Sequence, residues 1–479
     1  MTEVLAVASE VYPLIKTGGL ADVAGALPAA LKPHDINVRT LIPGYPQVMA
    51  KLGATAEAAR LDNFHGGPVR LLSGKVRDLE LFVLDAPHLF NRSGGPYSDT
   101  SGVDWPDNWR RFAALGDLAG QLARGLVPAY RPAIVHAHDW QAALAPAHLR
   151  YHGSGGARSV LTIHNLAFQG QFAAQYFPAL GLPAVANGLD GVEYYGGIGF
   201  LKGGLVSADA ITTVSPTYAR EIRTPEFGMG LDGLLNQRLE RLHGIVNGID
   251  IGEWNPSADA ALAATFTVAQ PNLRAANKRA VEARFGLETG EGPILAAVTR
   301  LTWQKGIDII ADCADRLVAL GGRLAVLGSG EAALEKAISA AAAKHPGKIG
   351  VVIGYDENLS HLLQGGADCI LVPSRFEPCG LTQLYGLRYG CVPVVSRVGG
   401  LNDTVIDAND AALDAGVATG FQFAPLNALA LGDAFVRVMA LYADQNAWRK
   451  MQRRGMKSDV SWTKSAARYA DLFRSLLAE

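Results

Sequence analysis

The sequence predicts an α/β protein built from two doubly wound domains, each a parallel sheet with helices on both faces. The chain has 479 residues, whereas a single hydrophobic core stops growing at roughly 250–300 residues. Short apolar runs alternate with longer segments of helical periodicity along the chain. Most of these runs are continuously apolar, which is typical of parallel strands that are buried on both faces.

The predicted elements follow one another in a regular order. In the first half, strands are predicted at residues 4–9, 38–42, 79–85, 133–139, 159–165 and 210–215. In the second half, they are predicted at residues 293–299, 323–329, 349–354, 369–374 and 392–396. Predicted helices include residues 108–126, 306–320, 337–345 and 462–478. Residues 244–257 are rich in turn-forming residues and indicate a domain boundary near residue 250. The weakly patterned residues 258–275 are expected to be a surface excursion.

Composition and charge exclude several classes of protein. Hydrophobic residues make up 49% of the chain, charged residues 18%, and the formal net charge is -2. These values are ordinary for a globular protein and give no global reason to bind nucleic acid or an anionic membrane. The N-terminus has no signal-peptide pattern, and no run of 18 apolar residues exists. The four cysteines form no CxxC pair, so a structural zinc site is not expected and a reducing cytoplasm is predicted.

Glycine is the one residue type that is more frequent than usual, and several glycine clusters follow predicted strands and begin predicted helices. These clusters are residues 16–23, 328–333, 377–381 and 397–404. Backbone N–H groups at helix starts bind anions, and glycine lets a phosphate approach closely. The pattern therefore favours a phosphorylated ligand held between two domains. Residues 328–333 (GSGEAA) also match the dinucleotide fingerprint, which leaves a plain strand-to-helix turn and an NAD-dependent oxidoreductase as alternatives.

Charged residues lie in the predicted strand-end loops of the second half. Arg300 and Lys305 suit a pyrophosphate, with a solvated loop as the alternative. Glu377 precedes a helix and suits sugar hydroxyls, although a helix dipole alone also favours Glu there. Cys379 beside it is expected to line a pocket rather than to act as a nucleophile.

Histidines end two predicted strands of the first half. Strand alternation puts His136 and His138 on one face, but no third ligand is identifiable, so no metal is predicted. His164 and Asn165 are expected to hydrogen-bond sugar hydroxyls at the edge of the sheet.

Together these motifs resemble the bacterial glycogen synthase and starch synthase family. The resemblance rests on residues 9–23 (SEVYPLIKTGGLADV), 136–141, 162–170, 244–250, 299–306 (TRLTWQKG) and 373–390 (PSRFEPCGLTQLYGLRYG). It implies the GT-B architecture, in which two Rossmann-like domains face each other across a cleft. It also implies transfer of glucose from ADP-glucose to the non-reducing end of glycogen or another α-1,4-glucan, with retention of configuration and without a cofactor.

The resemblance also implies boundaries and roles. The implied domains are residues 1–248 on the acceptor side, residues 249–457 for the nucleotide sugar, and a C-terminal helix within 458–479 that packs back on the first domain. Catalytic roles fall to Glu377, Arg300, Lys305 and His164. Substrate-binding roles fall to Lys16, Gly18, Gly19, Tyr97, Asp139, Asn247, Gly330, Tyr355, Cys379, Gly380, Leu381 and Thr382.

One departure bears on mechanism. Many retaining GT-B enzymes carry a second Glu eight positions after the first, where this chain has Tyr385. The bacterial synthases also lack it, so we expect front-face displacement rather than a two-carboxylate mechanism. Two alternatives remain: a related GT-B enzyme with another nucleotide sugar or acceptor, and a glucan-binding protein without turnover.

Overall fold

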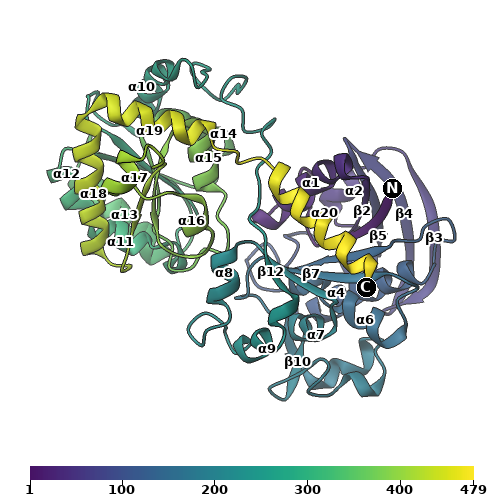
Figure 1. Cartoon of the computed structure of the whole chain (residues 1–479). Coiled ribbons are helices and arrows are strands. Elements are labelled where there is room, and N and C mark those ends of the chain that lie inside the picture. Colours follow the sequence, from purple (N-terminus) through teal and green to yellow (C-terminus); the bar gives the residue numbers. More distant parts are fainter. The chain divides into compact units, whose positions relative to one another are not determined.

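The computed structural model describes residues 1–479, which fold as two compact units (Figure 1). Unit 1 comprises Met1–Asn247 and Trp462–Glu479, and unit 2 comprises Gly248–Ser461. Both chain ends therefore lie in unit 1.

Unit 1 is built on a nine-stranded sheet in the order β12-β11-β7-β6-β1-β2-β5-β4-β3. Its strands are β1 (Thr2–Val7), β2 (Ile36–Pro43), β3 (Thr55–Phe64), β4 (Gly67–Val76), β5 (Leu79–Asp85), β6 (Ile134–His138), β7 (Arg158–Ile163), β11 (Ala210–Thr213) and β12 (Leu242–Gly244). The seven strands from β12 to β5 are parallel. Their order changes direction between β1 and β6, which makes that point the topological switch of a Rossmann-like sheet.

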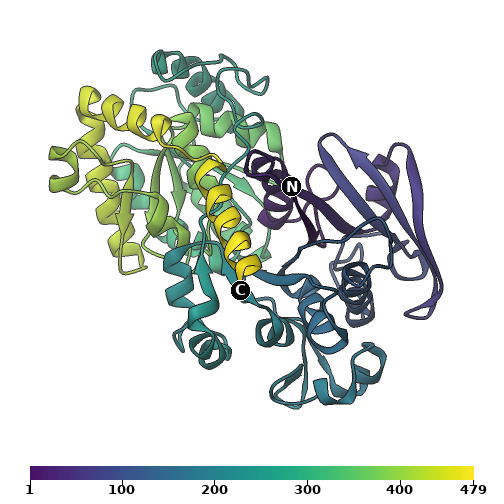
Figure 2. The ribbon, with the colours of Figure 1, turned by 45° about the vertical axis from the view of Figure 1, so that its right-hand side comes forward.

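The β3–β4 hairpin extends this sheet with two antiparallel strands, which Figure 2 shows as the long blue-purple pair. The sequence pattern does not reveal β3, because most of its residues are exposed or half-buried. A second, three-stranded sheet joins β8 (Gln171–Ala173), β10 (Gly197–Gly199) and β9 (Glu193–Tyr194).

Helices bury both faces of the unit 1 sheet. Alternate residues of β1 belong to two separate cores, with Leu5 and Val7 in one and Val4 and Ala6 in the other. The helices are α1 (Gly19–Leu31), α2 (Pro46–Lys51), α3 (Pro87–Phe90), α4 (Asn108–Ala123), α5 (Asp139–Ala142), α6 (Leu144–His152), α7 (Phe200–Ser207), α8 (Pro216–Glu221), α9 (Asp232–Gln237) and α20 (Thr463–Ala478). The C-terminal helix α20 packs on α1 and contributes Tyr469 and Phe473 to the second core.

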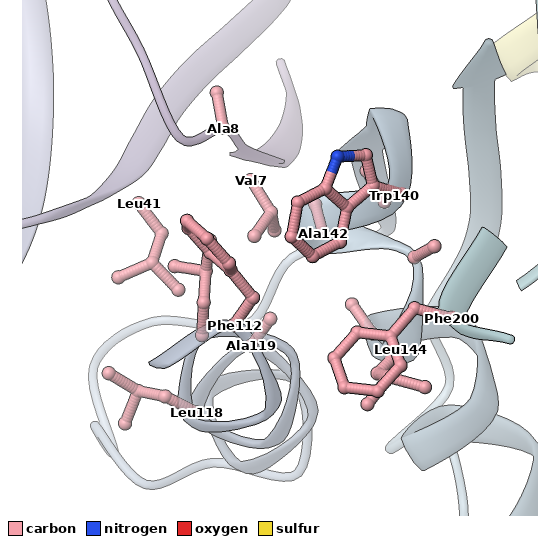
Figure 3. Packing of buried hydrophobic residues seen from close by; sticks show 14 of the residues in the cluster. Val7, Ala8, Leu41, Phe112, Leu118, Ala119, Trp140, Ala142, Leu144 and Phe200 are labelled. Carbon is pink, nitrogen blue, oxygen red and sulfur yellow. The ribbon is translucent and has the colours of Figure 1, made fainter. Parts of the chain in front are cut away.

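The larger core anchors the strand ends from which polar groups emerge. Figure 3 shows Phe112 of α4 packed near Val7, the last residue of β1, and Trp140 of α5. The rings of Phe112 and Trp140 meet edge to face with centroids 5.0 Å apart. Close packing of this kind fixes the backbone of the loops that follow β1 and β6.

Unit 2 contains a six-stranded, all-parallel sheet in the order β15-β14-β13-β16-β17-β18. Its strands are β13 (Ile294–Val298), β14 (Arg323–Gly328), β15 (Ile349–Ile353), β16 (Cys369–Val372), β17 (Val392–Ser396) and β18 (Phe421–Phe423). The switch point lies between β13 and β16. Leu295 and Ala297 face one core and Ile294 and Ala296 the other, so both faces are buried. The prediction of two doubly wound α/β domains is confirmed.

The helices of unit 2 contain one break that the sequence pattern does not show. They are α10 (Arg274–Phe285), α11 (Ile307–Asp312), α12 (Ala314–Ala319), α13 (Ala332–Lys344), α14 (Glu357–Gly366), α15 (Thr382–Tyr389), α16 (Gly399–Thr404), α17 (Asp410–Asp414), α18 (Ala428–Ala443) and α19 (Gln445–Lys457). The single helix predicted at 306–320 is two short helices that meet at Cys313, whose thiol donates a hydrogen bond to Ala428 O at 2.9 Å.

Most of residues 258–275 are exposed or half-buried, as expected of a surface excursion, but the segment is anchored to the rest of unit 2. Phe266 is buried, and Asp259 accepts hydrogen bonds from Tyr389 Oη at 2.6 Å and, at 2.7 Å, from His361 Nδ1. Just upstream, the Trp254 ring is stacked between His361 and Tyr385 at 3.8 and 3.6 Å. The segment is thus held by side chains far away in sequence, which a local pattern does not report. No helix in the structure combines the length and apolar character needed to cross a membrane.

Candidate active site

Several of the predicted site residues lie at the switch points of the two sheets. In unit 1, Lys16 lies in the loop after β1, and Asp139 follows β6 directly. In unit 2, Arg300 and Lys305 lie in the loop after β13, and Glu377 lies in the loop after β16. The carboxyl ends of strands at a switch point are where open α/β sheets bind ligands.

Glu377 and Lys305 form an ion pair in unit 2. Lys305 Nζ lies 2.5 Å from Glu377 Oε2, and Ser374 Oγ donates to the same oxygen at 2.7 Å. Glu377 is only 7% exposed. Its second oxygen, Oε1, has no hydrogen bond within the protein, so one oxygen is anchored and the other is available to a ligand hydroxyl.

The turn that carries Lys305 is held against the Glu377 loop. Arg375 makes two hydrogen bonds to the Asp308 carboxylate, at 2.8 and 2.6 Å, and donates to Trp303 O at 2.5 Å. Bidentate pairs of this kind fix geometry as well as charge. Arg300, by contrast, is exposed, and its guanidinium makes no hydrogen bond or ion pair within the protein. It is a free cation beside the Lys305–Glu377 pair in sequence and a ready ligand for an anion.

The glycines of residues 397–404 have a packing role. A Cβ atom on Gly399 would lie 2.0 Å from Glu377 O, and one on Gly400 would lie 2.3 Å from Cys379 O. The Gly400 N–H also donates to Glu377 O at 3.1 Å. These glycines let α16 approach the loop that presents Glu377, which is a structural reason for a motif that the sequence alone associates with phosphate.

Gly330 has a similar role in the loop after β14. A Cβ atom there would lie 2.3 Å from Leu301 O, so glycine allows this loop to pair with the Arg300 loop. The GSGEAA motif follows the second strand of the unit 2 sheet, whereas a dinucleotide fingerprint belongs after the first strand. The GSGEAA motif therefore no longer supports the alternative of an NAD-dependent oxidoreductase, which rested on this motif alone.

The start of α15 presents backbone donors. Thr382 is its first residue, and no side chain caps the helix. Gly380 has φ of +72°, a left-handed conformation that favours glycine. Uncapped N–H groups after Leu381 suit an anion. Cys379 is buried, at 4% exposure, and its backbone packs against α16.

Tyr355 lies apart from this group, in the loop after the edge strand β15. Its side chain is 77% exposed, and its hydroxyl donates to Glu357 Oε2 at 2.6 Å. An exposed ring is suited to stacking on a planar ligand.

In unit 1, a buried carboxylate organises the glycine-rich loop. Glu10 is 2% exposed and accepts hydrogen bonds from Thr17 N, from Thr17 Oγ1 at 2.6 Å and from Tyr97 Oη. Lys16 is exposed and pairs with Asp22 at 2.9 Å. Gly18 and Gly19 are also exposed, and α1 starts there without a side-chain cap. Glu10 thus links the loop to Tyr97.

Asp139 and His138 hold His164 from two sides. Asp139 Oδ1 accepts from the backbone N–H groups of His164 at 2.7 Å and Asn165 at 3.3 Å. His138 Nδ1 lies 3.0 Å from His164 Nε2. Burial raises the pKa of Asp139 to about 7, lowers the pKa of His138 to about 4 and lowers the pKa of His164 well below its usual value.

The predicted pairing of His136 and His138 on one face is confirmed, with ring centroids 4.2 Å apart. His136 Nε2 contacts Thr162 Oγ1 at 2.6 Å rather than a ligand site. Asn247 is buried, and its Oδ1 has no hydrogen-bond partner, so it carries an unused acceptor.

Glu10, Ser374 and the partnership of His138 with His164 were not identified from the sequence. Glu10 follows the first predicted strand closely, so a carboxylate after a buried strand was the available signal. Ser374 and His138 carry no such signal, because their importance depends on partners that are brought to them by the fold.

Comparisons with known proteins agree with this geometry. A model described as starch synthase catalytic domain matches residues 3–237, and one described as glycosyl transferases group 1 matches residues 280–455. Glycogen synthase from Mesorhizobium japonicum is 59% identical over 477 residues, covering 100% of this chain and 99% of the relative. Glycogen synthase from Novosphingobium aromaticivorans is 60% identical over 480 residues, with the same coverage.

Solved structures are similar as well. The catalytic domain of starch synthase IV from Arabidopsis thaliana, bound to ADP and acarbose, matches with a TM-score of 0.89 and 30% identity over 100% of both chains. Sucrose-phosphate synthase from Thermosynechococcus elongatus shares the fold, with a TM-score of 0.60 and 16% identity over 100% of both chains. The chain is a retaining glucosyltransferase of GT-B fold and belongs to the glycogen synthase and starch synthase family.

Proposed function

We propose that this glycosyltransferase moves a glucosyl group from ADP-glucose to the non-reducing end of glycogen or a related α-1,4-glucan. The observation that carries the proposal is the Lys305–Glu377 pair, a cation and a half-anchored carboxylate at the switch point of unit 2. The relatives are named glycogen synthase, which supports a glucan acceptor, and the plant starch synthase is bound to ADP, which supports an ADP-linked donor.

In unit 2, cations bind the diphosphate of the donor ADP-glucose, and a carboxylate binds its glucose. Arg300 and Lys305 hold the diphosphate and stabilise the charge that develops on it as ADP leaves. The free oxygen of Glu377 accepts hydrogen bonds from glucose hydroxyls. The backbone N–H groups near Cys379, Gly380, Leu381 and Thr382 add donors for phosphate, Gly330 lies near the phosphates, and Tyr355 stacks on the adenine.

In unit 1, other residues contact the transferred sugar and the acceptor. Lys16, Gly18 and Gly19 contact the donor. His164 contacts the transferred glucose, while Asp139 and Asn247 face the donor or the acceptor. Tyr97 contacts the acceptor glucan.

The proposed chemistry is a front-face displacement at the anomeric carbon of glucose. The bond from this carbon to the β-phosphate oxygen breaks, and its electron pair leaves with ADP. The 4-hydroxyl oxygen of the acceptor forms the new bond on the same face, and its proton passes to the departing phosphate. No second carboxylate is needed, and Tyr385, at the position of one in other retaining enzymes, is stacked on Trp254.

The proposal also places the enzyme in the cytoplasm, without a metal or cofactor and without a nucleic-acid or membrane partner. The four cysteines are buried and form no disulfide bond, as thiols do in a reducing compartment.

The test is a donor panel with purified protein and glycogen. ADP-, UDP- and GDP-glucose are supplied in turn, and nucleoside diphosphate release and incorporated glucose are measured. We expect ADP-glucose to give the highest kcat/KM and the new linkages to be cut by an α-1,4-specific glucanase. Preference for another nucleotide sugar would assign the chain to a related transferase, and glycogen binding without ADP release would identify a binding protein. Trapping a covalent glucosyl-enzyme by mass spectrometry would overturn the front-face mechanism.

A further inference from the structure

His138 is a buried histidine that the proposed reaction leaves without a role. It ends β6, is 1% exposed, and lies on the strand next to the one that leads to His164. Its Nδ1 is 3.0 Å from His164 Nε2, and the two ring centroids are 5.2 Å apart. This is hydrogen-bond geometry between two ring nitrogens.

Only one ring nitrogen of His164 remains for a ligand. Burial lowers the pKa of both imidazoles, so both rings are neutral at pH 7. A neutral imidazole carries a single N–H, and therefore one ring donates and the other accepts in this contact. Because Nε2 of His164 is used, Nδ1 alone can meet a substrate, and its proton depends on His138.

The backbone of His164 does not need His138. Asp139 holds that backbone through the N–H groups of residues 164 and 165. The contact from His138 is therefore the one that sets the angle and the tautomer of the ring, a frequent second role of histidine partners.

The His138 ring is itself fixed. Its neighbour His136 lies 4.2 Å away and contacts Thr162 Oγ1, which contacts Thr212 Oγ1 at 2.6 Å. Tyr469 and Phe473 of α20 pack on His136 at 5.5 and 5.7 Å. A donor held this firmly can orient its partner.

We propose that His138 is a positioning residue that donates its Nδ1–H to His164 Nε2, so that His164 presents Nδ1–H to a hydroxyl oxygen of the glucosyl group. This role rests on the function proposed above. The 3.0 Å separation of the two ring nitrogens requires one of them to donate, and the tautomer measurement below decides which one does.

The kinetic test compares two substitutions in the full chain. His138→Leu removes the donor, and His138→Asn keeps an N–H near the position of Nδ1. We expect kcat of the Leu variant to fall about tenfold, the size of one hydrogen bond, with KM for ADP-glucose within about threefold, and the Asn variant to recover most of kcat. His345→Leu, which removes a half-buried histidine paired with Asp315 in unit 2, is the control and keeps wild-type kcat.

The spectroscopic test needs no substrate. Protein with ¹⁵N-labelled histidine is examined for two-bond ¹⁵N–¹H correlations, with His164 assigned by the loss of its signal in His164→Gln. We expect a protonated Nδ1 and a bare Nε2 on His164. The opposite tautomer, wild-type kcat in the folded Leu variant, or an Asn variant as slow as Leu would each overturn the assignment. If the wild-type protein transfers no glucose from ADP-glucose, the proposed function fails while the tautomer result still decides the role of His138.

Discussion

The sites at the two switch points differ in how their polar and charged side chains are buried and paired. In unit 1 the polar groups are buried and bonded mostly to one another: Glu10 holds three donors, and Asp139 and His138 hold His164. In unit 2 the groups are formally charged, with Arg300 unpaired and Lys305 paired to Glu377.

The difference matches two kinds of ligand. Burial lowers the pKa of the unit 1 histidines and raises the pKa of Asp139, so it disfavours the charged forms of these three side chains, and neutral hydrogen-bonding groups suit a sugar. Exposed and half-buried cations suit a diphosphate whose charge grows during the reaction. Changes in unit 2 should therefore alter the rate through charge, and changes in unit 1 through geometry.

The largest expected effect is in unit 2. Lys305→Ala should lower kcat about 10²–10³-fold, because one positioned electrostatic donor to the leaving group is lost. Steady-state rates with ADP-glucose and glycogen measure it. Lys344→Ala, which removes an exposed lysine paired with Asp315, is the matched control and should leave kcat unchanged. A Lys305→Ala rate within about twofold of wild type would remove Lys305 from the mechanism.

The next effect concerns the pH dependence of stability in unit 1. Burial raises the pKa of Asp139 from 3.8 to about 7, so the folded state binds the proton more tightly than the unfolded chain. The resulting stabilisation is present at low pH and is lost as the pH rises from about 4 to about 7. Asp139→Asn keeps the acceptor oxygen but not the titration. Relative to wild type, the free energy of unfolding of Asp139→Asn should therefore rise by about 2 kcal/mol from pH 5 to pH 8.

Melting temperatures of wild type and Asp139→Asn at these two pH values provide the measurement. Asp62→Asn, on the outer strand β3, is the control and should show no such divergence. A difference between Asp139→Asn and wild type that stays constant with pH would contradict the raised pKa.

A smaller effect is expected from Glu10. Glu10→Gln replaces one acceptor oxygen by an N–H₂ group, so at least one of the three donors from Thr17 and Tyr97 loses its acceptor. The loop at residues 16–19 loses an anchor, and kcat/KM for ADP-glucose should fall about tenfold. Glu57→Gln, which removes an exposed charge on β3, should leave it unchanged. Unaltered kinetics in the Glu10 variant would show that the loop needs no such anchor.

The smallest expected effect is at Tyr355. Tyr355→Ala should raise KM for ADP-glucose about threefold with kcat unchanged, since a stacked aromatic contact is worth about 0.5–1.5 kcal/mol. Tyr355→Phe keeps the ring and removes the hydroxyl that donates to Glu357, so it should behave like wild type. A Phe variant as impaired as Ala would assign the effect to the hydroxyl instead.

Much of the architecture could be predicted from local pattern. Continuously apolar runs mark the central strands of both sheets, because burial on both faces favours apolar residues at successive positions. The pattern predicts neither the β3–β4 hairpin nor the break at Cys313, since β3 is largely exposed and Cys313 contacts Ala428, which is far away in the sequence. The anchoring of residues 258–275 likewise depends on distant partners.

By itself, the sequence determined that this is a two-domain α/β protein with its polar motifs at strand ends, and its motifs identified the family. Only the tertiary structure decided which of those motifs hold one another. Lys305 and Glu377 are 72 residues apart, Glu10 and Tyr97 are 87 apart, and the glycines of 399–400 allow close packing against the Glu377 loop. The physical reason is that periodicity records whether a residue is buried, whereas the identity of its partner depends on strand order and register, which are settled only when the whole sheet has formed.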